Sequence, residues 1–268
     1  IGRPAQLERA VSSWTSAPVP GTVAQALRAA GLWSFDRPQD FDASDWWYRT
    51  AFAAPVTDLA FLCFDALATR AEVWLNGRLL LTADNMFRAY RVDVSGQLEA
   101  DNELVIAFRS LTHDLKAKRP RPRWKTNLVA HQQLRWHRTT LLGRIPGWSP
   151  VAPPVGPWRP VRLEAGDLIV SDARLHAGLD GDTGVVTVAA TVHSRSPIDG
   201  VTFRVGTAEG PVEFVPAADG WELRGRLWVP DPPRWWPHTH GGQPLVACSL
   251  MIEAGGRAHA VDAGAVGF

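Results

Sequence analysis

The feature that most constrains the fold is a long succession of short apolar and β-branched runs separated by turn residues, which predicts strands. Only residues 22–31 have a helical pattern, with Thr22 as the expected N-cap and Gly31 as the expected stop. The sequence Asn76-Gly77 between two apolar runs predicts a tight hairpin. The chain is therefore predicted to be all-β.

The texture of the sequence changes near Gly166, which predicts a domain boundary. The first part is rich in Trp and irregular in spacing, whereas the second part has short strands at even intervals over roughly 100 residues, a pattern typical of a β-sandwich. A chain of 268 residues suits one or two domains. We therefore predict two domains, residues 1–165 and residues 166–268.

Charge is distributed unevenly along a chain whose formal net charge is only +1. That net charge gives no general attraction to nucleic acid or to a membrane surface. Nine of the 28 basic residues, however, lie between residues 115 and 145, where there is no Asp or Glu: Lys116, Lys118, Arg119, Arg121, Arg123, Lys125, Arg135, Arg138 and Arg144. This segment fits a solvated surface, a loop that borders another domain or, less well, a nucleic-acid contact.

Other residue types limit the chemistry and the compartment. Cys63 and Cys248 each lie in an apolar run and are predicted to be buried free thiols. The eight His have no metal-ligand spacing, and no phosphate-binding loop is present, so we predict no cofactor and no metal. No apolar run approaches membrane-spanning length, so we predict no membrane partner. No signal peptide is visible, although one could have preceded Ile1; the compartment stays open, with the cytoplasm slightly favoured.

Tryptophan is unusually frequent, with 13 residues against two Tyr. Because large aromatic side chains mostly supply buried area, the expectation for any single Trp is a place in the core. The alternative is a platform that stacks on a sugar ring.

A series of motifs in a fixed order resembles the N-terminal half of glycoside hydrolase family 2, above all its β-mannosidase-like members. The motifs are Val19-Pro20-Gly21-Thr22, Asp45-Trp46-Trp47-Tyr48-Arg49, Val73-Trp74-Leu75-Asn76-Gly77, Asn85-Met86-Phe87-Arg88-Ala89-Tyr90, Asn102-Glu103-Leu104-Val105-Ile106, Gly147-Trp148-Ser149-Pro150, Gly156-Pro157-Trp158-Arg159-Pro160 and Pro233-Arg234-Trp235-Trp236-Pro237. Each motif alone is weak, but their order and spacing together are specific.

The resemblance implies a fold and a function. The fold is a galactose-binding-like jelly-roll sandwich followed by an immunoglobulin-like sandwich. The function is that of the non-catalytic N-terminal portion of an enzyme that hydrolyses terminal β-linked sugars with retention, using two carboxylates on a barrel further along the chain. The implied partners are a carbohydrate and that barrel, and this chain alone is expected to be inactive. A stand-alone carbohydrate-binding or scaffold module is the alternative.

The resemblance also implies candidate site residues. No catalytic residue is expected, because the Asn102-Glu103 pair precedes a sandwich strand rather than ending a barrel strand. The candidates for substrate contact are Arg138, Arg144, Trp148 and Ser149. In β-mannosidases of the family an Asp that contacts the sugar stands where this chain has Ser149, which has no carboxylate. The sequence leaves two alternatives open: a substrate other than a β-mannoside, or another residue in that role.

The resemblance places residues 115–150 beside the barrel. Without the barrel we expect this segment to be mobile, because its like charges repel and its prolines oppose regular structure. We also expect Trp148 to be unusually exposed, or else buried in a substitute contact with another chain.

Overall fold

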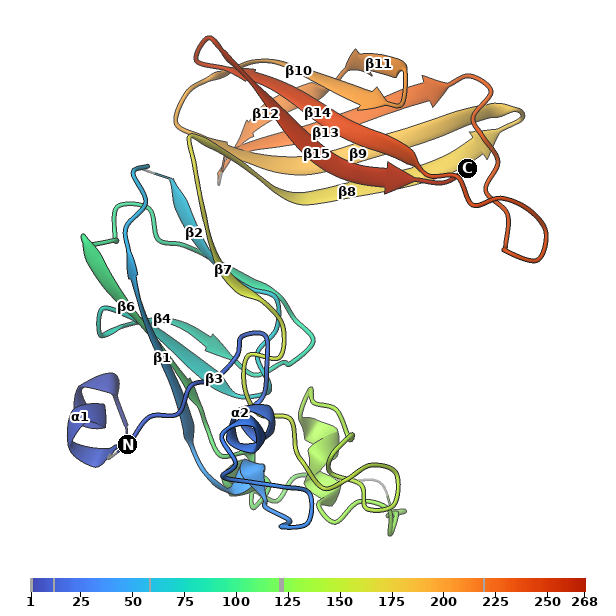
Figure 1. Cartoon of the computed structure of the whole chain (residues 1–268). Helices are drawn as coiled ribbons and strands as arrows, with labels where there is room; N and C mark the ends of the chain where they lie inside the picture. The colour runs from blue at the N-terminus through green and yellow to red at the C-terminus, as the bar shows by residue number, and fades with distance from the viewer. Residues whose placement is uncertain (1, 12, 58, 121–122, 219) are drawn as a thin grey trace. The chain divides into compact units, whose positions relative to one another are not determined.

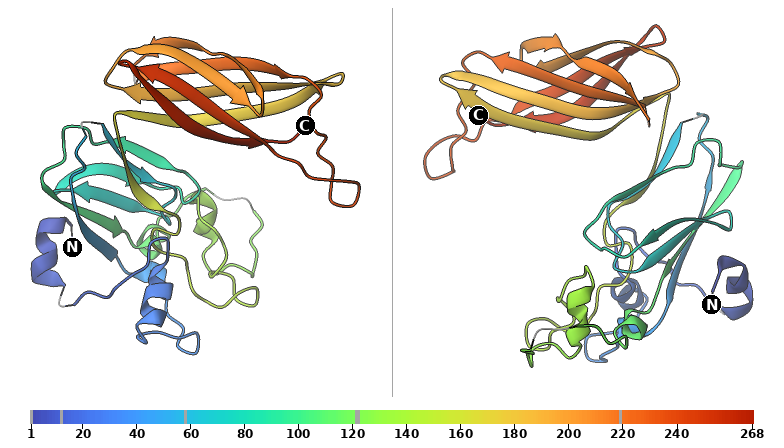
Figure 2. Two further views of the ribbon diagram at one scale, coloured as in Figure 1. Left: turned by 45° about the horizontal axis from the view of Figure 1, so that its top comes forward. Right: turned by 180° about the vertical axis from the view of Figure 1, so that it is seen from behind.

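A computed structural model describes residues 2–11, 13–57, 59–120, 123–218 and 220–268. The chain divides into two compact units: unit 1 is residues 1–56 and 60–164, and unit 2 is residues 57–59 and 165–268. Figures 1 and 2 show that strands dominate both units. The prediction of an all-β chain is confirmed.

Unit 1 is a sandwich of one four-stranded and one three-stranded sheet. The four-stranded sheet has the order β1-β6-β3-β4, and the three-stranded sheet the order β5-β2-β7. The strands are β1 (Trp46–Ala53), β2 (Ala60–Phe64), β3 (Ala71–Leu75), β4 (Arg78–Ala83), β5 (Tyr90–Asp93), β6 (Asp101–Phe108) and β7 (Val161–Ala165). Strand β1 forms one edge of the larger sheet and β7 one edge of the smaller.

Alternation along the strands builds the core of unit 1. Successive side chains of a strand point to opposite faces, so Leu104, Ile106 and Phe108 of β6 all enter the main core. Val105, on the opposite face of β6, packs with Leu7 of the short helix α1 (Leu7–Ala10). Both faces of this central strand are therefore covered.

The predicted helix and hairpin of unit 1 are confirmed. Helix α2 (Val23–Ala29) begins after Thr22, whose side chain accepts a hydrogen bond from the Gln25 backbone at 3.3 Å. Strands β3 and β4 join at Asn76 and Gly77, which both have positive φ (49° and 78°), as a type I′ turn requires.

Unit 2 is a sandwich of two four-stranded antiparallel sheets, ordered β12-β13-β9-β8 and β11-β10-β14-β15. The strands are β8 (Leu168–Asp180), β9 (Thr183–Ser194), β10 (Ile198–Val205), β11 (Ala208–Pro211), β12 (Glu213–Ala217), β13 (Gly220–Val229), β14 (Val246–Ala254) and β15 (Arg257–Val266). Lettered in chain order, the sheets are ABED and C′CFG, which is the immunoglobulin-like arrangement. Both parts of the predicted fold class are thus present.

Several details differ from the sequence expectations. The short strands β11 and β12 were not predicted, because four or five residues at a polar edge give no clear alternation. Strand β7 begins at Val161; Trp158 lies before it and donates its indole N–H to the Met86 carbonyl at 2.9 Å. Cys63 and Cys248 are buried free thiols, as predicted.

The expectation that tryptophans belong to the core was wrong for most of them. Only Trp33 and Trp74 are buried. Seven of the 13 are exposed: Trp14, Trp124, Trp136, Trp148, Trp228, Trp235 and Trp236. Six of these seven lie in segments outside the strands, with Trp228 in β13 as the exception, so most have no facing sheet to cover them.

Candidate functional site

The segment that carries the four candidate residues connects β6 to β7 and contains little regular structure. Its first part holds helix α3 (Leu111–Asp114) and a 3₁₀ turn, η3 (Gln132–Trp136). Leu111, Leu115 and Leu134 form a small buried cluster that ties η3 back to α3. Of the predicted basic run, Arg121 lies outside the described residues.

The last part of the segment, residues 139–152, forms a compact loop that we call the Trp148 loop. Gly143 donates its backbone N–H to the Ser149 hydroxyl at 2.8 Å, and Ala152 donates to the Gly143 carbonyl at 3.1 Å. These bonds close the loop on itself. Ser149 is therefore engaged with the loop's own backbone.

Arg144 fixes the base of the Trp148 loop. Its Nε and Nη2 lie 2.6 and 2.8 Å from the two carboxylate oxygens of Asp42, and its Nη1 donates to the Thr140 carbonyl at 2.8 Å and the Thr139 hydroxyl at 3.2 Å. The side chains of Arg144 and Asp42 are only 4% and 7% exposed. Four of the five guanidinium donors are thus used inside unit 1, which leaves little capacity for a sugar hydroxyl.

Asp42 is brought to Arg144 by a short turn some 100 residues earlier in the chain. It belongs to η2 (Phe41–Ala43), where the Asp40 side chain accepts from the Asp42 N–H at 3.0 Å. Phe41 is fully buried and meets the Trp33 and Trp46 rings at centroid distances of 5.1 and 5.9 Å. The aromatic core therefore holds the turn that presents the carboxylate.

Met86 is a second anchor of the loop, a role that its sequence motif does not indicate. Its sulfur accepts from the Thr140 N–H at 3.0 Å and from the Thr139 hydroxyl at 3.3 Å. Its backbone N–H donates to the Arg138 carbonyl at 3.0 Å. Residues 138–140 are therefore tied to the β4–β5 connection, although we expected this segment to be mobile.

Exposed apolar side chains gather on the same segment. They are Trp124, Leu128, Trp136, Leu141, Leu142, Trp148 and Val151. Trp148 is 75% exposed, which confirms the expected exposure. Arg135 lies over the Trp124 ring, with 5.2 Å from the guanidinium carbon to the ring centroid. Arg138 is also exposed, so the candidates Arg138 and Trp148 reach solvent while Arg144 and Ser149 face inward.

His137, next to the loop, has a polar atom that lacks a partner. Among the described residues, nothing hydrogen-bonds its buried Nε2. Burial lowers the pKa of His137, and the cationic Arg119 lowers it further. The imidazole is therefore neutral at pH 7.

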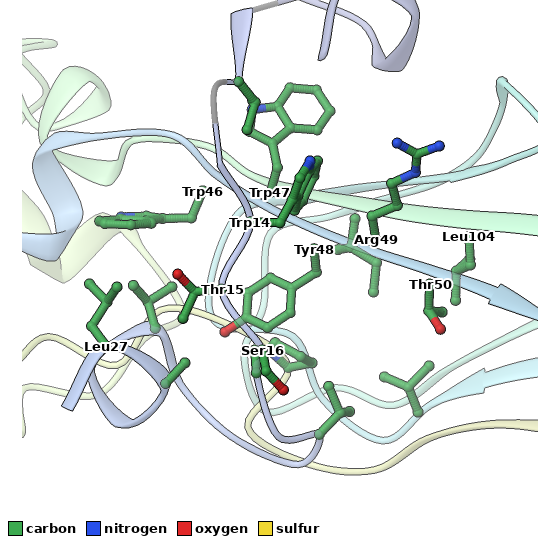
Figure 3. Close-up of a pocket in the computed structure, with 18 of the residues that line it drawn as sticks. Trp14, Thr15, Ser16, Leu27, Trp46, Trp47, Tyr48, Arg49, Thr50 and Leu104 are labelled. Atoms are coloured by element: carbon green, nitrogen blue, oxygen red, sulfur yellow. The ribbon is translucent and has the colours of Figure 1, made fainter. Parts of the chain in front are cut away.

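A cavity of about 890 Å³ opens at the β1 edge of unit 1 (Figure 3). Its lining is mainly apolar and aromatic and also includes hydroxyl side chains: the aromatic members are Trp14, Trp46, Trp47 and Tyr48, and the hydroxyl members are Ser13, Thr15, Ser16, Thr50 and Tyr48. Figure 3 labels the aromatic residues Trp14, Trp46, Trp47 and Tyr48 among the residues that line the cavity. Burial raises the pKa of Tyr48, so its phenol stays neutral.

Gly156 lies against Tyr48, one of the residues that line this cavity. It has φ +130°, and a Cβ there would lie 2.8 Å from the Tyr48 hydroxyl. Any larger residue would push Tyr48 out of its place.

Carboxylates and metals offer no further site. Glu103 of the Asn102-Glu103 pair is bound by Arg49 at 2.5 Å, and the Asn102 amide bonds to Asn76 and Glu99. In the part of the chain that the structure describes, no group of His, Cys, Asp and Glu could hold a metal ion. No helix there is long and apolar enough to cross a membrane.

Comparison with known proteins decides the family. Residues 5–159 match the family described as glycosyl hydrolase 2 galactose-binding domain-like. The chain belongs to glycosyl hydrolase family 2. The resemblance of the sequence motifs is thereby confirmed.

Curated relatives of this family 2 chain include two fungal enzymes named β-mannosidase B. The one from Emericella nidulans is 28% identical over 92% of this chain and 32% of its own length. The one from Thermothelomyces thermophilus is 31% identical over 79% of this chain and 26% of its own length. The chain thus spans a third or less of these relatives.

Solved structures share the fold at low identity. A β-D-mannosidase from Dictyoglomus thermophilum superposes with a TM-score of 0.69 at 21% identity, over 94% of this chain and 34% of its own. An exo-chitosanase from Amycolatopsis orientalis gives 0.64 at 21%, over 97% and 32%. A Lactobacillus rhamnosus β-glucuronidase gives 0.60 at 18%, over 98% and 41%. These names cover different sugars, so the shared fold does not identify the substrate.

Proposed function

We propose that this chain is the non-catalytic N-terminal portion of a β-mannosidase-like enzyme that hydrolyses terminal β-linked sugars with retention. The enzyme's two carboxylates then belong to a barrel further along the polypeptide. Family membership supports this, as does coverage of a third or less of the β-mannosidase relatives. The observation that carries the proposal is the Trp148 loop: its base is fixed and buried, while Trp148 at its tip is 75% exposed.

In this proposal Arg138 and Trp148 contact the substrate at the border of the catalytic pocket. Both are exposed: Arg138 directly precedes the Trp148 loop, and Trp148 lies at its tip. An indole face suits a sugar ring, and a guanidinium suits its hydroxyls. Ser149 has no carboxylate, and its hydroxyl already accepts from Gly143. Its neighbourhood therefore supports a sugar other than a β-mannoside as readily as a mannoside.

Hydrolysis assays test the proposal. The purified chain is incubated with aryl β-mannoside, β-glucuronide and β-galactoside, and the longer polypeptide encoded around it is assayed in parallel. We expect no turnover by the chain and turnover by the longer enzyme. Turnover by the chain that survives repurification refutes the proposal, and so does a coding sequence without a barrel carrying two carboxylates.

A stand-alone carbohydrate-binding module is the second candidate function, and the cavity beside β1 supports it. Trp14 is 47% exposed among hydroxyl side chains, a combination that fits a sugar ring. Fluorescence titration with oligosaccharides measures the binding affinity of the chain. Trp14→Ala should weaken that affinity. Trp228→Ala, an exposed Trp of unit 2, is the control that should leave binding unchanged.

A further inference from the structure

The strongest unexplained feature outside the predicted motifs is Asp42. No sequence motif included it, yet it is one of four buried polar or charged residues among those described. Its carboxylate holds Arg144 in a two-point pair at 2.6 and 2.8 Å. The pair joins the η2 turn to the Trp148 loop, two segments about 100 residues apart.

We propose that Asp42 and Arg144 are positioning residues that hold the Trp148 loop in one conformation before any carbohydrate binds. The inference rests on the proposed role of Trp148 as a substrate contact. In this inference Arg144 is no longer a candidate for substrate contact. Asp42 joins the residues that support the site, because it holds Arg144, but it touches no substrate itself. Pre-ordering the loop means that binding energy is not spent on ordering it later.

The geometry of the pair fits a positioning role. A guanidinium bound at two points by a carboxylate is fixed in plane and direction, whereas an ammonium would be fixed only in distance. Nη1 of Arg144 extends this order to Thr139 and Thr140, both of which also donate to the Met86 sulfur. Three segments of unit 1 therefore meet at the base of the loop.

Stability alone is a weak reason for such a pair. Replacing a buried ion pair by apolar side chains of similar size is often neutral or stabilising, because two charges no longer have to be desolvated. A double variant, Asp42→Leu with Arg144→Met, should therefore keep unit 1 folded while it removes the two-point fixation. Stability and positioning can be separated in this way.

The test measures the distance distribution between two spin labels by double electron–electron resonance. One label is attached at Leu142→Cys in the loop and the other at Thr82→Cys on β4; both positions are exposed. Cys63 and Cys248 are buried, and burial raises the pKa of both thiols, that of Cys63 to about 11, so they stay unlabelled at pH 7. Melting temperature is recorded for every variant.

We expect one narrow distance distribution for the parent sequence. In the Asp42→Leu/Arg144→Met variant the distribution should become broad, while the melting temperature changes little. Arg144→Lys, which keeps the charge but not the fork, should give an intermediate width. The control variant Arg49→Met with Glu103→Leu removes an exposed ion pair of the same unit and should leave the distribution narrow. A narrow distribution in a folded double variant, or in folded Arg144→Lys, overturns the inference.

A separate measurement tests whether Trp148 contacts substrate, independently of whether Asp42 and Arg144 position the loop. The labelled longer enzyme is assayed with aryl β-glycosides, and Trp148→Ala is compared with its parent. If Trp148→Ala leaves kcat/KM unchanged, Trp148 is not a substrate contact and that part of the proposed function fails. The distance distributions still decide whether Asp42 and Arg144 position the loop.

Discussion

Each unit of this chain packs two β-sheets face to face, but the two units differ in the number of strands and in the length of their connections. Unit 2 has four strands in each sheet, and its connections are short apart from residues 230–245 between β13 and β14. Its alternating β9 and β14 residues fill a continuous core. Unit 1 has sheets of four and three strands, a cavity at the β1 edge and a long connection between β6 and β7. The regular strands of unit 2 mainly build its core, whereas the irregular parts of unit 1 carry the candidate site. Loops on a rigid scaffold are free to vary, so they commonly carry functional residues.

The largest expected loss of stability comes from removing a buried charge in unit 1, compared with an exposed charge in unit 2. Asp42→Ala leaves Arg144 buried without its carboxylate, so unit 1 should lose about 3–5 kcal/mol of unfolding free energy. In unit 2 the exposed pair of Glu222 and Arg224 should contribute little, so Glu222→Ala should cost less than about 1 kcal/mol. Urea denaturation followed by circular dichroism measures both. Equal losses would mean that Asp42 is reachable by water.

Separate cores give the next prediction. Leu250 of β14 is fully buried in unit 2, so Leu250→Ala should destabilise unit 2 by about 2–5 kcal/mol. If the units fold independently, the melting transition of unit 1 stays where it was, and limited proteolysis releases an intact unit 1. A matching shift of both transitions would show one cooperative core instead. Val215→Ala, an exposed change in β12, is the control.

A smaller effect is expected at the helix predicted most clearly. The Thr22 hydroxyl caps α2 at 3.3 Å, so Thr22→Ala should cost about 1 kcal/mol in unit 1. Thr22→Ser keeps the oxygen and should restore most of the loss. Chemical denaturation again gives the values, and a Thr22→Ser variant as weak as Thr22→Ala would show that the methyl group, not the cap, matters.

A pH effect follows from His137. Its pKa in the folded state is lowered by burial and by Arg119, so folding favours the neutral form. The associated stability is fully present above the ordinary His pKa of about 6.5 and is lost as the pH falls below it. We expect a small drop in the unit 1 melting temperature between pH 7 and pH 5 that disappears in His137→Gln. The exposed His113→Gln is the control and should keep the drop.

The sequence predicted the strands better than the contacts between loops. Alternation and turn residues are local properties, so the Asn76-Gly77 hairpin and the capped helix α2 could be identified from a few neighbouring residues. The short edge strands β11 and β12 lack that local signal. The family could be identified because its motifs occur in order along the chain.

The sequence predicts which segment carries the candidate site, but it does not predict which side chains of that segment reach solvent and which are buried. Trp148 and Arg138 are exposed as a contact role requires, yet Arg144 is buried against Asp42. Nothing in the sequence near Arg144 indicates a partner about 100 residues away, because such pairings arise only from tertiary folding. Asp42 is one of four Asp residues between Trp33 and Trp46, and nothing in the sequence distinguishes it from the other three.

The smallest expected effect on stability concerns Trp148 and completes the comparison between the base and the tip of its loop. Because Trp148 is 75% exposed, Trp148→Ala should change the unfolding free energy of unit 1 by no more than about 0.5 kcal/mol. If the tip contacts substrate in the longer enzyme, the same change should lower kcat/KM about tenfold, which corresponds to about 1.4 kcal/mol of transition-state stabilisation. Arg138→Ala should behave alike, and Trp228→Ala should alter neither quantity. A variant that unfolds unit 1 and spares catalysis would instead place Trp148 in the structural part of the loop, and the division between a fixed base and a functional tip would have to be abandoned.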